Sequence, residues 1–461
     1  MFGNTRHIHF VAIGGIGMSG IAEVLWNLGF SVSGSDLREN AATVRLRGLG
    51  AVVHIGHDPA HIKGADVVVR SSAVTEANCE VDAARRARIP VIRRAEMLAE
   101  LMRLKQGISI AGSHGKTTTT SLVAGVLGAG GMDPTVIVGG VVRAVGSNAI
   151  LGGGEHLVAE ADESDGTFLH LTPTIAVVTN IDHEHVDFYP DLDSLRDAFR
   201  RFVQQVPFYG TCVLCADDPE TRALIPHIDR KVVTYGLDPA AQVRCEPGTI
   251  VATEAGQEAV VWEGDRELGV LKLSLRGTHN LRNALAAVAV GRELEIPFAA
   301  IGKGLAGDLV VGRRCEFHGE HGGVLVLDDY GHHPTEIAAT LEVAHTYGRP
   351  VTVLFQPHRY SRTAMFAREF ADVLARADRV GLLPVYAASE PATEGVDSGL
   401  IADRLQAVLP GRCDLLAGLE DVAAWLDARV PDGDLLLTLG AGDIGRLVPD
   451  IMTQLDRRSG A

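Results

Sequence analysis

The sequence has little of three things that define whole classes of proteins: paired cysteines, long apolar runs and clustered basic residues. Its 461 residues include only six cysteines, of which only Cys212 and Cys215 have the spacing of a metal-binding or redox pair. No second pair completes a zinc site, and two thiols three residues apart on a strand point to opposite faces. We therefore interpret both residues as ordinary members of a strand.

Apolar and basic segments are limited in the same way. No stretch approaches the ~20 consecutive apolar residues of a membrane-spanning helix, and residues 1–16 contain a short apolar strand rather than a signal peptide. The 58 acidic residues outnumber the 42 basic ones, which gives a net charge of −16. Because nucleic-acid phosphates attract basic surfaces, we expect no nucleic-acid partner. Since no apolar segment resembles a membrane span or a signal peptide, we also expect a cytoplasmic protein with no membrane insertion.

The composition is that of a large α/β enzyme. Hydrophobic residues make up 46% of the chain, the mean hydropathy is +0.14, and there are 52 glycines. Such a composition supports sizeable cores and many tight turns between strands and helices. At ~150 residues per domain, the length corresponds to about three domains. We predict domains at residues 1–104, 105–312 and 313–461.

The most informative stretch is residues 108–120, Ile-Ser-Ile-Ala-Gly-Ser-His-Gly-Lys-Thr-Thr-Thr-Thr. It predicts the end of a buried strand, a tight turn at Gly112 and Gly115, and a helix that begins at Lys116. Backbone N–H groups and the helix dipole then converge on one point, which suits a phosphate chain. In such a P-loop, Lys116 would reach the outer phosphates and the Thr117 hydroxyl a phosphate-bound Mg²⁺. The first glycine of the general pattern is missing, so this is a variant; the alternative is a glycine-rich turn with a solvated lysine.

A second glycine pattern lies near the N-terminus. Residues 15–20 match Gly-x-Gly-x-x-Gly after a strand at 7–13, and the next strand ends at Asp36, where a dinucleotide fold places its ribose-binding acid. The same pattern recurs at residues 440–445. Two matches in one chain mark tight turns as readily as NAD sites, so an NAD-dependent oxidoreductase remains an alternative.

Polar residues gather after the strands of the central region. A strand at 157–159 ends in the acidic run 160–165, where Mg²⁺ beside a P-loop needs a carboxylate. A strand at 175–179 ends in a hydrophilic cluster at 180–187; a solvated loop is the alternative. Residues 242–275 predict a few short strands outside the main sheet. The helix that follows carries His279 and Asn283 on one face, where they could meet the edge of a base, with N-terminal capping as the plainer interpretation.

The last third repeats this arrangement. A glycine-rich connector at 302–312 leads to a strand at 324–327, followed by the polar run 328–334. A strand at 351–355 precedes Arg359 and Arg362, which could clamp carboxylates or phosphates; solvated arginines are the alternative. Further strands at 380–383 and 435–439 complete a second doubly wound sheet.

These motifs, in this order, resemble the Mur ligases, the ATP-dependent amide-bond ligases of peptidoglycan synthesis. The matching runs are residues 13–22, 114–120, 160–166, 328–336, 355–360 and 439–444. The resemblance implies an α/β protein of three domains: an N-terminal Rossmann-like domain, a central P-loop ATPase-type domain with a mostly parallel sheet, and a C-terminal Rossmann-like domain. The chain departs from the family pattern between Asp308 and Cys315, where the aromatic residues that usually flank the arginine pair are missing, and at Ser113, where threonine is common.

The resemblance also implies the residues of each site. The UDP-sugar residues would be Gly15, Gly17, Ser19, Ser35, Asp36 and Ser71. The ATP residues would be Gly112, Ser113, His114, Gly115, Lys116, Thr117, Thr118, His279, Asn283 and Asp329. The Mg²⁺ ligands would be Thr117, Glu160 and His185, and the acceptor amino acid would be held by Tyr330, Arg359 and Arg362. Lys116, His185 and Arg314 would be catalytic, with Arg314 near the γ-phosphate.

The implied reaction joins L-alanine to the carboxylate of UDP-N-acetylmuramate through an acyl phosphate. Phosphoryl transfer between two anions depends on charge neutralisation, and a site spread over three domains implies closure that excludes water. The alternative within the family is a ligase that adds a murein tripeptide to the same nucleotide sugar. A P-loop switch or transport ATPase is the alternative outside it. We expect a monomer or weak homodimer.

Overall fold

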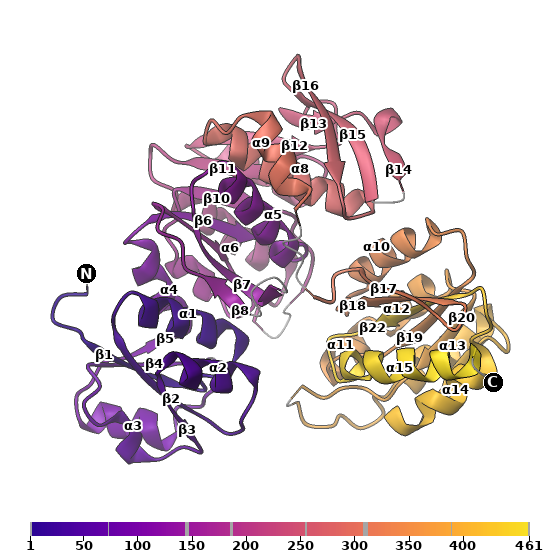
Figure 1. Ribbon diagram of the computed structural model, residues 1–461, viewed down its shortest axis with the longest axis horizontal. Helices are drawn as coiled ribbons and strands as arrows, with labels where there is room; N and C mark the ends of the chain where they lie inside the picture. The colour runs from indigo at the N-terminus through magenta and orange to yellow at the C-terminus, as the bar shows by residue number, and fades with distance from the viewer. Residues whose placement is uncertain are drawn as a thin grey trace. The chain divides into compact units, whose positions relative to one another are not determined.

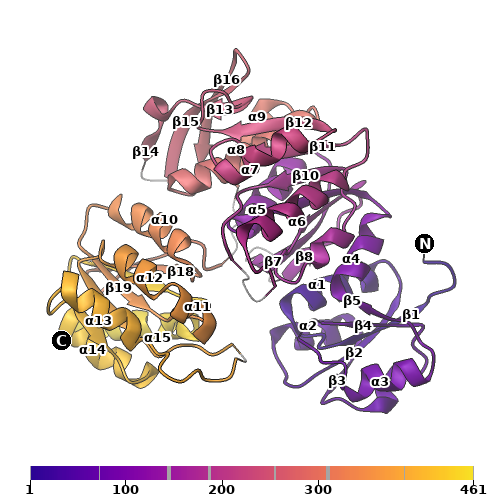
Figure 2. The ribbon, with the colours of Figure 1, turned by 180° about the vertical axis from the view of Figure 1, so that it is seen from behind.

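The computed structural model describes residues 2–71, 73–142, 147–184, 188–253, 256–307, 312–388 and 390–459. The chain forms two compact units, Met1–Ser274 with Asn280–Val311, and Leu275–His279 with Gly312–Ala461. Figures 1 and 2 show the elements of each from two sides. In the part of the chain that the structure describes, no helix is both long and apolar enough to cross a membrane.

The first sheet is a parallel five-stranded sheet of Rossmann type, with strand order β3-β2-β1-β4-β5. Its strands are β1 (His7–Val11), β2 (Ser31–Asp36), β3 (Val52–Ile55), β4 (Val67–Arg70) and β5 (Val91–Arg93); its helices are α1 (Ile16–Asn27), α2 (Ala41–Leu49), α3 (Cys79–Arg86) and α4 (Arg94–Met102). Alternate residues of β1, such as Ile8 and Phe10, are fully buried in the core that includes α1. Because β1 lies between β2 and β4, the turns after these three strands meet at one edge.

The second sheet is an eleven-stranded sheet built around β6, whose neighbours are β9 and β10. Its strands are β6 (Gln106–Ala111), β7 (Thr135–Val142), β8 (Ser147–Ile150), β9 (His156–Glu160), β10 (Ile175–Val178), β11 (Thr211–Cys215), β12 (Lys231–Gly236), β13 (Val243–Cys245), β14 (Val251–Thr253), β15 (Gly256–Glu263) and β16 (Arg266–Leu273). The helices are α5 (Lys116–Ala129), α6 (Leu192–Gln204), α7 (Pro219–Leu224), α8 (Thr278–Glu293) and α9 (Phe298–Leu305). Strands β7, β9, β6, β10, β11, β12 and β13 are parallel (Figure 2), so the turn after β6 lies between the ends of β9 and β10.

Two expectations for this region were wrong. The strands predicted to lie outside the main sheet extend it, because β13 pairs with β12 in parallel and β15 then pairs with β13 antiparallel. Part of the expected glycine-rich connector at 302–312 is the helix α9, and residues 308–311 lie outside the described residues. One glycine of this helix serves close packing: a Cβ at Gly304 would lie 2.5 Å from the carbonyl oxygen of Gly125 in α5.

The C-terminal unit contains a six-stranded sheet with the order β17-β18-β22-β19-β20-β21, parallel except for β17. The strands are β17 (Glu316–His321), β18 (Val324–Asp329), β19 (Val351–Phe355), β20 (Arg379–Leu382), β21 (Cys413–Leu415) and β22 (Leu435–Leu439). The helices are α10 (Pro334–His345), α11 (Tyr360–Met365), α12 (Ala367–Leu374), α13 (Gly399–Val408), α14 (Val422–Arg429) and α15 (Ile444–Ser459). Separate hydrophobic cores lie on the two faces of this sheet, as the helices in Figure 1 indicate. The predicted doubly wound sheet is confirmed.

The cysteine pair is also as predicted. Cys212 and Cys215 are buried free thiols within β11. Burial raises the pKa of Cys212 to about 12 and that of Cys215 to about 11. Neither thiol is therefore a thiolate at neutral pH, and neither suits redox chemistry.

Candidate active site

The turn after β6 has a backbone that only glycine adopts easily. Gly112 has a φ of +135° and Gly115 a φ of +80°. A Cβ at Gly112 would lie 2.0 Å from the Thr179 hydroxyl, and one at Gly115 would lie 2.7 Å from the side-chain oxygen of Asn283. Both glycines are therefore required by backbone angle and by space. Because α5 begins at Lys116, its unpaired N–H groups are gathered at this turn.

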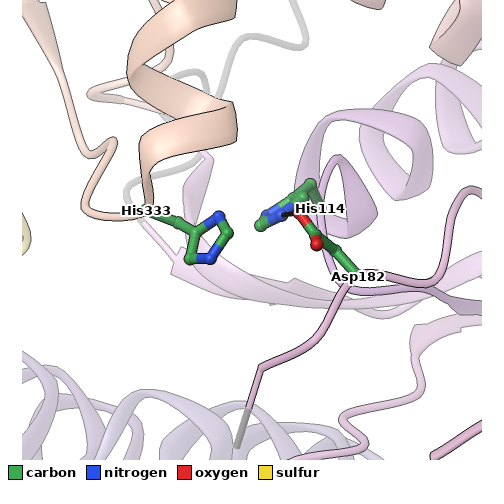
Figure 3. Close-up of side chains that lie close together, drawn as sticks. All are labelled: His114, Asp182 and His333. Carbon is green, nitrogen blue, oxygen red and sulfur yellow. Dashed lines mark hydrogen bonds and ion pairs between the residues drawn. The ribbon is translucent and has the colours of Figure 1, made fainter. Parts of the chain in front are cut away.

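The loop after β10 holds the turn in place. The N–H of His114 donates to the Asn180 side chain at 2.8 Å, and the Thr179 hydroxyl donates to the His114 carbonyl at 2.6 Å. The Ser113 hydroxyl accepts from the N–H of Asp182 at 2.8 Å and donates to the Asp182 carbonyl at 3.1 Å. Nε2 of His114 lies 3.1 Å from the Asp182 carboxylate, and Figure 3 shows these two side chains next to each other. The hydrophilic cluster predicted after β10 thus includes residues that fix the shape of the P-loop.

Lys116 finds its acceptors at the same turn. Its Nζ donates to the carbonyl of Gly112 at 2.5 Å and to that of Ser113 at 3.0 Å, and lies 2.9 Å from Oε2 of the fully buried Glu163. Burial lowers the pKa of Lys116, but the charges of Glu163 and Asp162 outweigh this effect and raise the pKa above its usual value. Lys116 is therefore a permanent positive charge at the start of α5.

Sequence reasoning did not single out Glu163. The acidic run 160–165 was visible, but its spacing does not tell which carboxylate reaches the P-loop. Glu160 ends β9, opposite Ile110 of β6, and accepts a hydrogen bond from the N–H of Gly139 at 2.7 Å. Glu163 lies beyond the end of the strand, where the chain turns back toward Lys116. Only the path of that loop distinguishes the two acids.

The donors predicted to hold Mg²⁺ belong to neighbouring elements. Thr117 lies in the first turn of α5, followed by Thr118, and Glu160 lies at the carboxyl end of β9, the strand beside β6. Hydroxyl and carboxylate oxygens are the ligands that Mg²⁺ prefers, so these two residues fit the ion. The third predicted ligand, His185, lies outside the described residues.

The helix α8 supplies one residue next to the P-loop. Asn283 is buried, its side chain contacts the position of the missing Cβ of Gly115, and its Nδ2 donates to the side chain of Asn280 at 3.5 Å. The predicted partner His279 belongs to the segment that groups with the C-terminal unit. There its ring lies 3.0 Å from the position that a Cβ of Gly277 would take.

The predicted UDP-sugar residues gather at one edge of the first sheet. Gly15 and Gly17 follow β1, Asp36 ends β2, and Ser71 follows β4. The Asp36 carboxylate accepts a hydrogen bond from the N–H of Gly14 at 2.9 Å, so it shapes the glycine-rich turn itself. Because β2, β1 and β4 are adjacent, these residues lie at the same edge of the sheet, and their contact with a UDP-sugar stays a prediction.

Ser35 is the exception in that group. It is fully buried, donates to Oε2 of Glu80 at 2.5 Å and lies 2.8 Å from Nδ1 of His57. Burial raises the pKa of Glu80, but hydrogen bonds from His9, Ser35 and His61 outweigh it and bring the pKa to about 2. Ser35 therefore belongs to a buried polar cluster, and its predicted contact with a nucleotide would require this cluster to open.

Ser19, another predicted UDP-sugar residue, forms a hydrogen bond with the second sheet. Its hydroxyl donates to the side chain of Asn148 in β8 at 3.3 Å, and Ser147 of the same strand donates to Glu23 of α1 at 2.8 Å. Arg45 completes an ion pair with Glu23 at 2.8 Å. These contacts join the first sheet's helix α1 to the edge of the second sheet.

The arginine pair at the start of the C-terminal unit lies beside Tyr330, and Arg313 also binds a buried carboxylate. Nε of Arg313 donates to the buried carboxylate of Asp328 at 2.8 Å, and another of its nitrogens donates to the carbonyl of Gly440 at 2.5 Å. Both guanidinium groups lie over the ring of the predicted acceptor residue Tyr330, that of Arg313 at 5.4 Å and that of Arg314 at 5.3 Å from its centre.

The predicted ATP residue Asp329 shapes the turn that carries these side chains. Its carboxylate accepts hydrogen bonds from the N–H of Cys315 and from that of Gly331, each at 2.7 Å. Burial raises the pKa of Asp329 above its usual value. A direct contact between Asp329 and ATP stays a prediction.

The predicted acceptor residues are linked by two histidines that sequence reasoning gave no role. The ring of Tyr330 lies 5.5 Å from that of His332, and His332 lies 5.6 Å from His358. Nη1 of Arg362 is 3.3 Å from Nδ1 of His358. Arg359 is the N-cap residue that precedes α11 and has a φ of +70°. The ends of β18 and β19 thus place Tyr330 and Arg362 in one cluster.

Comparison with known proteins identifies the class to which this architecture belongs. The model of the Mur ligase family catalytic domain matches residues 7–106, that of the Mur ligase middle domain matches 110–291, and that of the Mur ligase glutamate ligase domain matches 313–442. The chain belongs to the Mur ligase family, and the predicted three-domain α/β fold is confirmed.

Among its relatives are alanine ligases over their full length. The UDP-N-acetylmuramate–L-alanine ligase of Desulfosudis oleivorans is 51% identical over 459 residues, which cover 99% of this chain and 100% of that protein. The enzyme of the same name from Thiobacillus denitrificans is 51% identical over 455 residues, 96% of this chain and 97% of that protein. The crystal structure of UDP-N-acetylmuramate–alanine ligase from Thermotoga maritima matches with a TM-score of 0.81 at 30% identity and covers 99% of both chains. A murein peptide ligase from Psychrobacter arcticus shares the fold, with a TM-score of 0.71 at 23% identity over 98% of this chain and 99% of that one.

Proposed function

We propose that this protein is an ATP-dependent ligase that joins L-alanine to the carboxylate of UDP-N-acetylmuramate in peptidoglycan precursor synthesis. The observation that carries the proposal is that the chain is about 50% identical, over its full length, to ligases of that name. The tripeptide-adding alternative is less well supported, because two ligases of that kind with solved structures are only 23% and 27% identical to this chain. A cytoplasmic location would follow from this activity.

Each predicted site has a physical basis for its ligand. The glycine-rich turn at the edge of the first sheet, with Gly15 and Gly17 at the start of α1, suits the diphosphate of a nucleotide sugar because helix N-termini attract anions. The second sheet offers Lys116 and the N–H groups of α5 to the phosphates of ATP. Thr117 and Glu160 would hold Mg²⁺, which neutralises phosphate charge when bound.

The chemistry requires a strong field of positive charge in the central domain. A carboxylate is a poor acyl donor, so the muramyl carboxylate first takes the γ-phosphoryl group of ATP and becomes an acyl phosphate. Two anions must approach each other in that step, and the fixed charge of Lys116 lowers its barrier. The α-amine of alanine then attacks the acyl carbon, a tetrahedral intermediate forms, and phosphate leaves.

The C-terminal unit would supply the acceptor site. A free amino acid presents a carboxylate, and Arg359 and Arg362 can each bind one through paired N–H groups. Tyr330 and Arg314, one of the two arginines over its ring, would border the same place. An acceptor as small as alanine needs little more than its carboxylate held and its amine free to attack.

The decisive assay is phosphate release from ATP and Mg²⁺ with UDP-N-acetylmuramate, with and without L-alanine. Release that requires both, with ADP and UDP-N-acetylmuramoyl-L-alanine as products, would support the proposal. Activity only with the murein tripeptide as acceptor would replace it with the recycling ligase. ATP hydrolysis that needs no acceptor would indicate a P-loop ATPase. NADH binding measured by fluorescence would favour the alternative of an NAD-dependent oxidoreductase.

A further inference from the structure

Arg94, the first residue of α4, lies against the glycine-rich turn that follows β1. A Cβ at Gly17 would lie 2.7 Å from Nη1 of Arg94 and 3.0 Å from its Cδ, so the guanidinium rests directly on this turn. In a dinucleotide fold, the second glycine of the pattern lets a pyrophosphate approach the backbone. Here an arginine side chain borders that place.

The position is electrostatically unfavourable for a cation. Arg94 begins α4, and its guanidinium lies against the first turn of α1, whose first residue is Ile16. The N-terminus of a helix carries a partial positive charge, which disfavours cations and attracts anions. An arginine at the start of two helices therefore contributes nothing to either helix, and an anion bound between them would remove the conflict.

Asp162 compensates this charge only in part. Its carboxylate lies 3.6 Å from Nη2 of Arg94, and 44% of the Asp162 side chain is exposed. Ion pairs with this degree of exposure contribute little. Partial burial raises the pKa of Asp162, but the charges of Lys116 and Arg94 outweigh it and lower the pKa, so Asp162 is shared between two cations. Within the described ranges, no hydrogen bond of the Arg94 guanidinium accompanies this ion pair.

We propose that Arg94 binds the diphosphate of the nucleotide sugar, together with the backbone N–H groups at the start of α1. A guanidinium donates paired hydrogen bonds to phosphate oxygens, and its charge adds to that of the helix N-terminus. Asp162 borders the guanidinium from the second sheet and limits its movement. Arg94 has this role only if the first sheet binds the nucleotide sugar, as proposed above.

The test measures equilibrium binding by the full-length protein and does not depend on turnover. In calorimetric titration with UDP, the Kd of Arg94→Gln should be about tenfold to a hundredfold higher than that of the wild type, the effect of losing hydrogen bonds between charged groups. Arg94→Lys keeps the charge but not the paired donors, so its Kd should lie between the two. Uridine, which has no phosphate, should bind equally to all three proteins in ligand-observed NMR.

Two controls separate ligand binding from a structural role. Arg93→Gln changes the preceding arginine, which is exposed, and should leave the Kd for UDP unchanged. The melting temperature of ligand-free Arg94→Gln should be no lower than that of the wild type, because the substitution removes a cation from helix N-termini. A side chain that merely supported the turn would lower the melting temperature when replaced.

Equal Kd values for UDP in the wild type and in Arg94→Gln would overturn the role of Arg94 while the UDP-sugar site stands. Loss of uridine binding or a lower melting temperature in Arg94→Gln would also overturn it, because the side chain would then support the turn. An effect seen with UDP-N-acetylmuramate but not with UDP would refute the contact with the diphosphate. If the wild type binds neither UDP nor UDP-N-acetylmuramate, the proposed function itself fails.

Discussion

Replacing Lys116 by methionine should stop turnover and also weaken the fold, and the structure allows the two effects to be separated. The substitution removes the ammonium group that lies 2.9 Å from the fully buried carboxylate of Glu163. Breaking a buried ion pair in this way costs about 3–5 kcal/mol, because one charge is left without its partner. That is a large part of the ~5–15 kcal/mol by which a typical domain is stable.

The double variant Lys116→Met with Glu163→Gln removes the stranded charge. It should recover about 2 kcal/mol or more of the loss in the single variant. Turnover should stay absent in both, because neither supplies a positive charge to the phosphates. UDP-N-acetylmuramate binding, which we assign to the first sheet, should change little in either variant.

Native-state hydrogen exchange of the amides in β6 and α5 is the suitable assay, because it reports local opening in a protein of several domains. Calorimetric titration with UDP-N-acetylmuramate serves as the control for the first sheet. The reasoning would be refuted if the amides of α5 were equally protected against exchange in the single and double variants, or if the double variant regained ligase activity.

Further substitutions, two of them with a matched control, test three other features. Gly112→Ala should lower the free energy of unfolding by about 2–5 kcal/mol, because the backbone is left-handed there and the new Cβ would clash with Thr179. Gly131 has a φ of +75° but open space around it, so Gly131→Ala should lower the free energy of unfolding by only ~1–2 kcal/mol. Equal melting temperatures of the two variants would contradict this reasoning. Because the pKa of Glu80 is lowered to about 2, the stability it provides is complete above its unfolded-state pKa of about 4.3 and is lost as the pH falls toward 2. Thermal melts of Glu80→Gln across that range should therefore depend less on pH than those of the wild type, and parallel curves would rule the network out. Arg313→Gln should cost about 3–5 kcal/mol because it strands a buried carboxylate, while the matched change at the exposed Arg446 should cost less than ~1 kcal/mol in the same urea titration.

The glycine pattern at residues 440–445 shows that this motif can serve close packing. Gly440 has a φ of +140°, and its Cβ would lie 2.6 Å from the carbonyl oxygen of Gln356. A Cβ at Gly442 would lie 2.4 Å from the Gln356 side chain, and one at Gly445 would lie 2.3 Å from Arg313. These glycines allow β22 and α15 to approach their neighbours closely. At residues 440–445 the Gly-x-Gly-x-x-Gly pattern is therefore explained by packing. This is why the pattern by itself is weak evidence for an NAD site.

The sequence alone determined the order of strand, turn and helix, and with it the class of site. The P-loop was predictable from residues 108–120 because its signals are local: a buried strand, glycines with positive φ and a lysine at a helix start. The gathering of polar residues at strand ends was predictable too, since parallel strands end at one edge of a sheet.

Only the tertiary structure decided which polar residues meet. It selected Glu163 rather than Glu160 as the partner of Lys116, paired Arg313 with a buried carboxylate, and placed Ser35 inside a polar cluster. Each choice depends on loop paths and on contacts between segments far apart in the chain. Periodicity and spacing describe the immediate neighbours of a residue along the chain, whereas partners of this kind are set by which strands become adjacent when the sheet assembles.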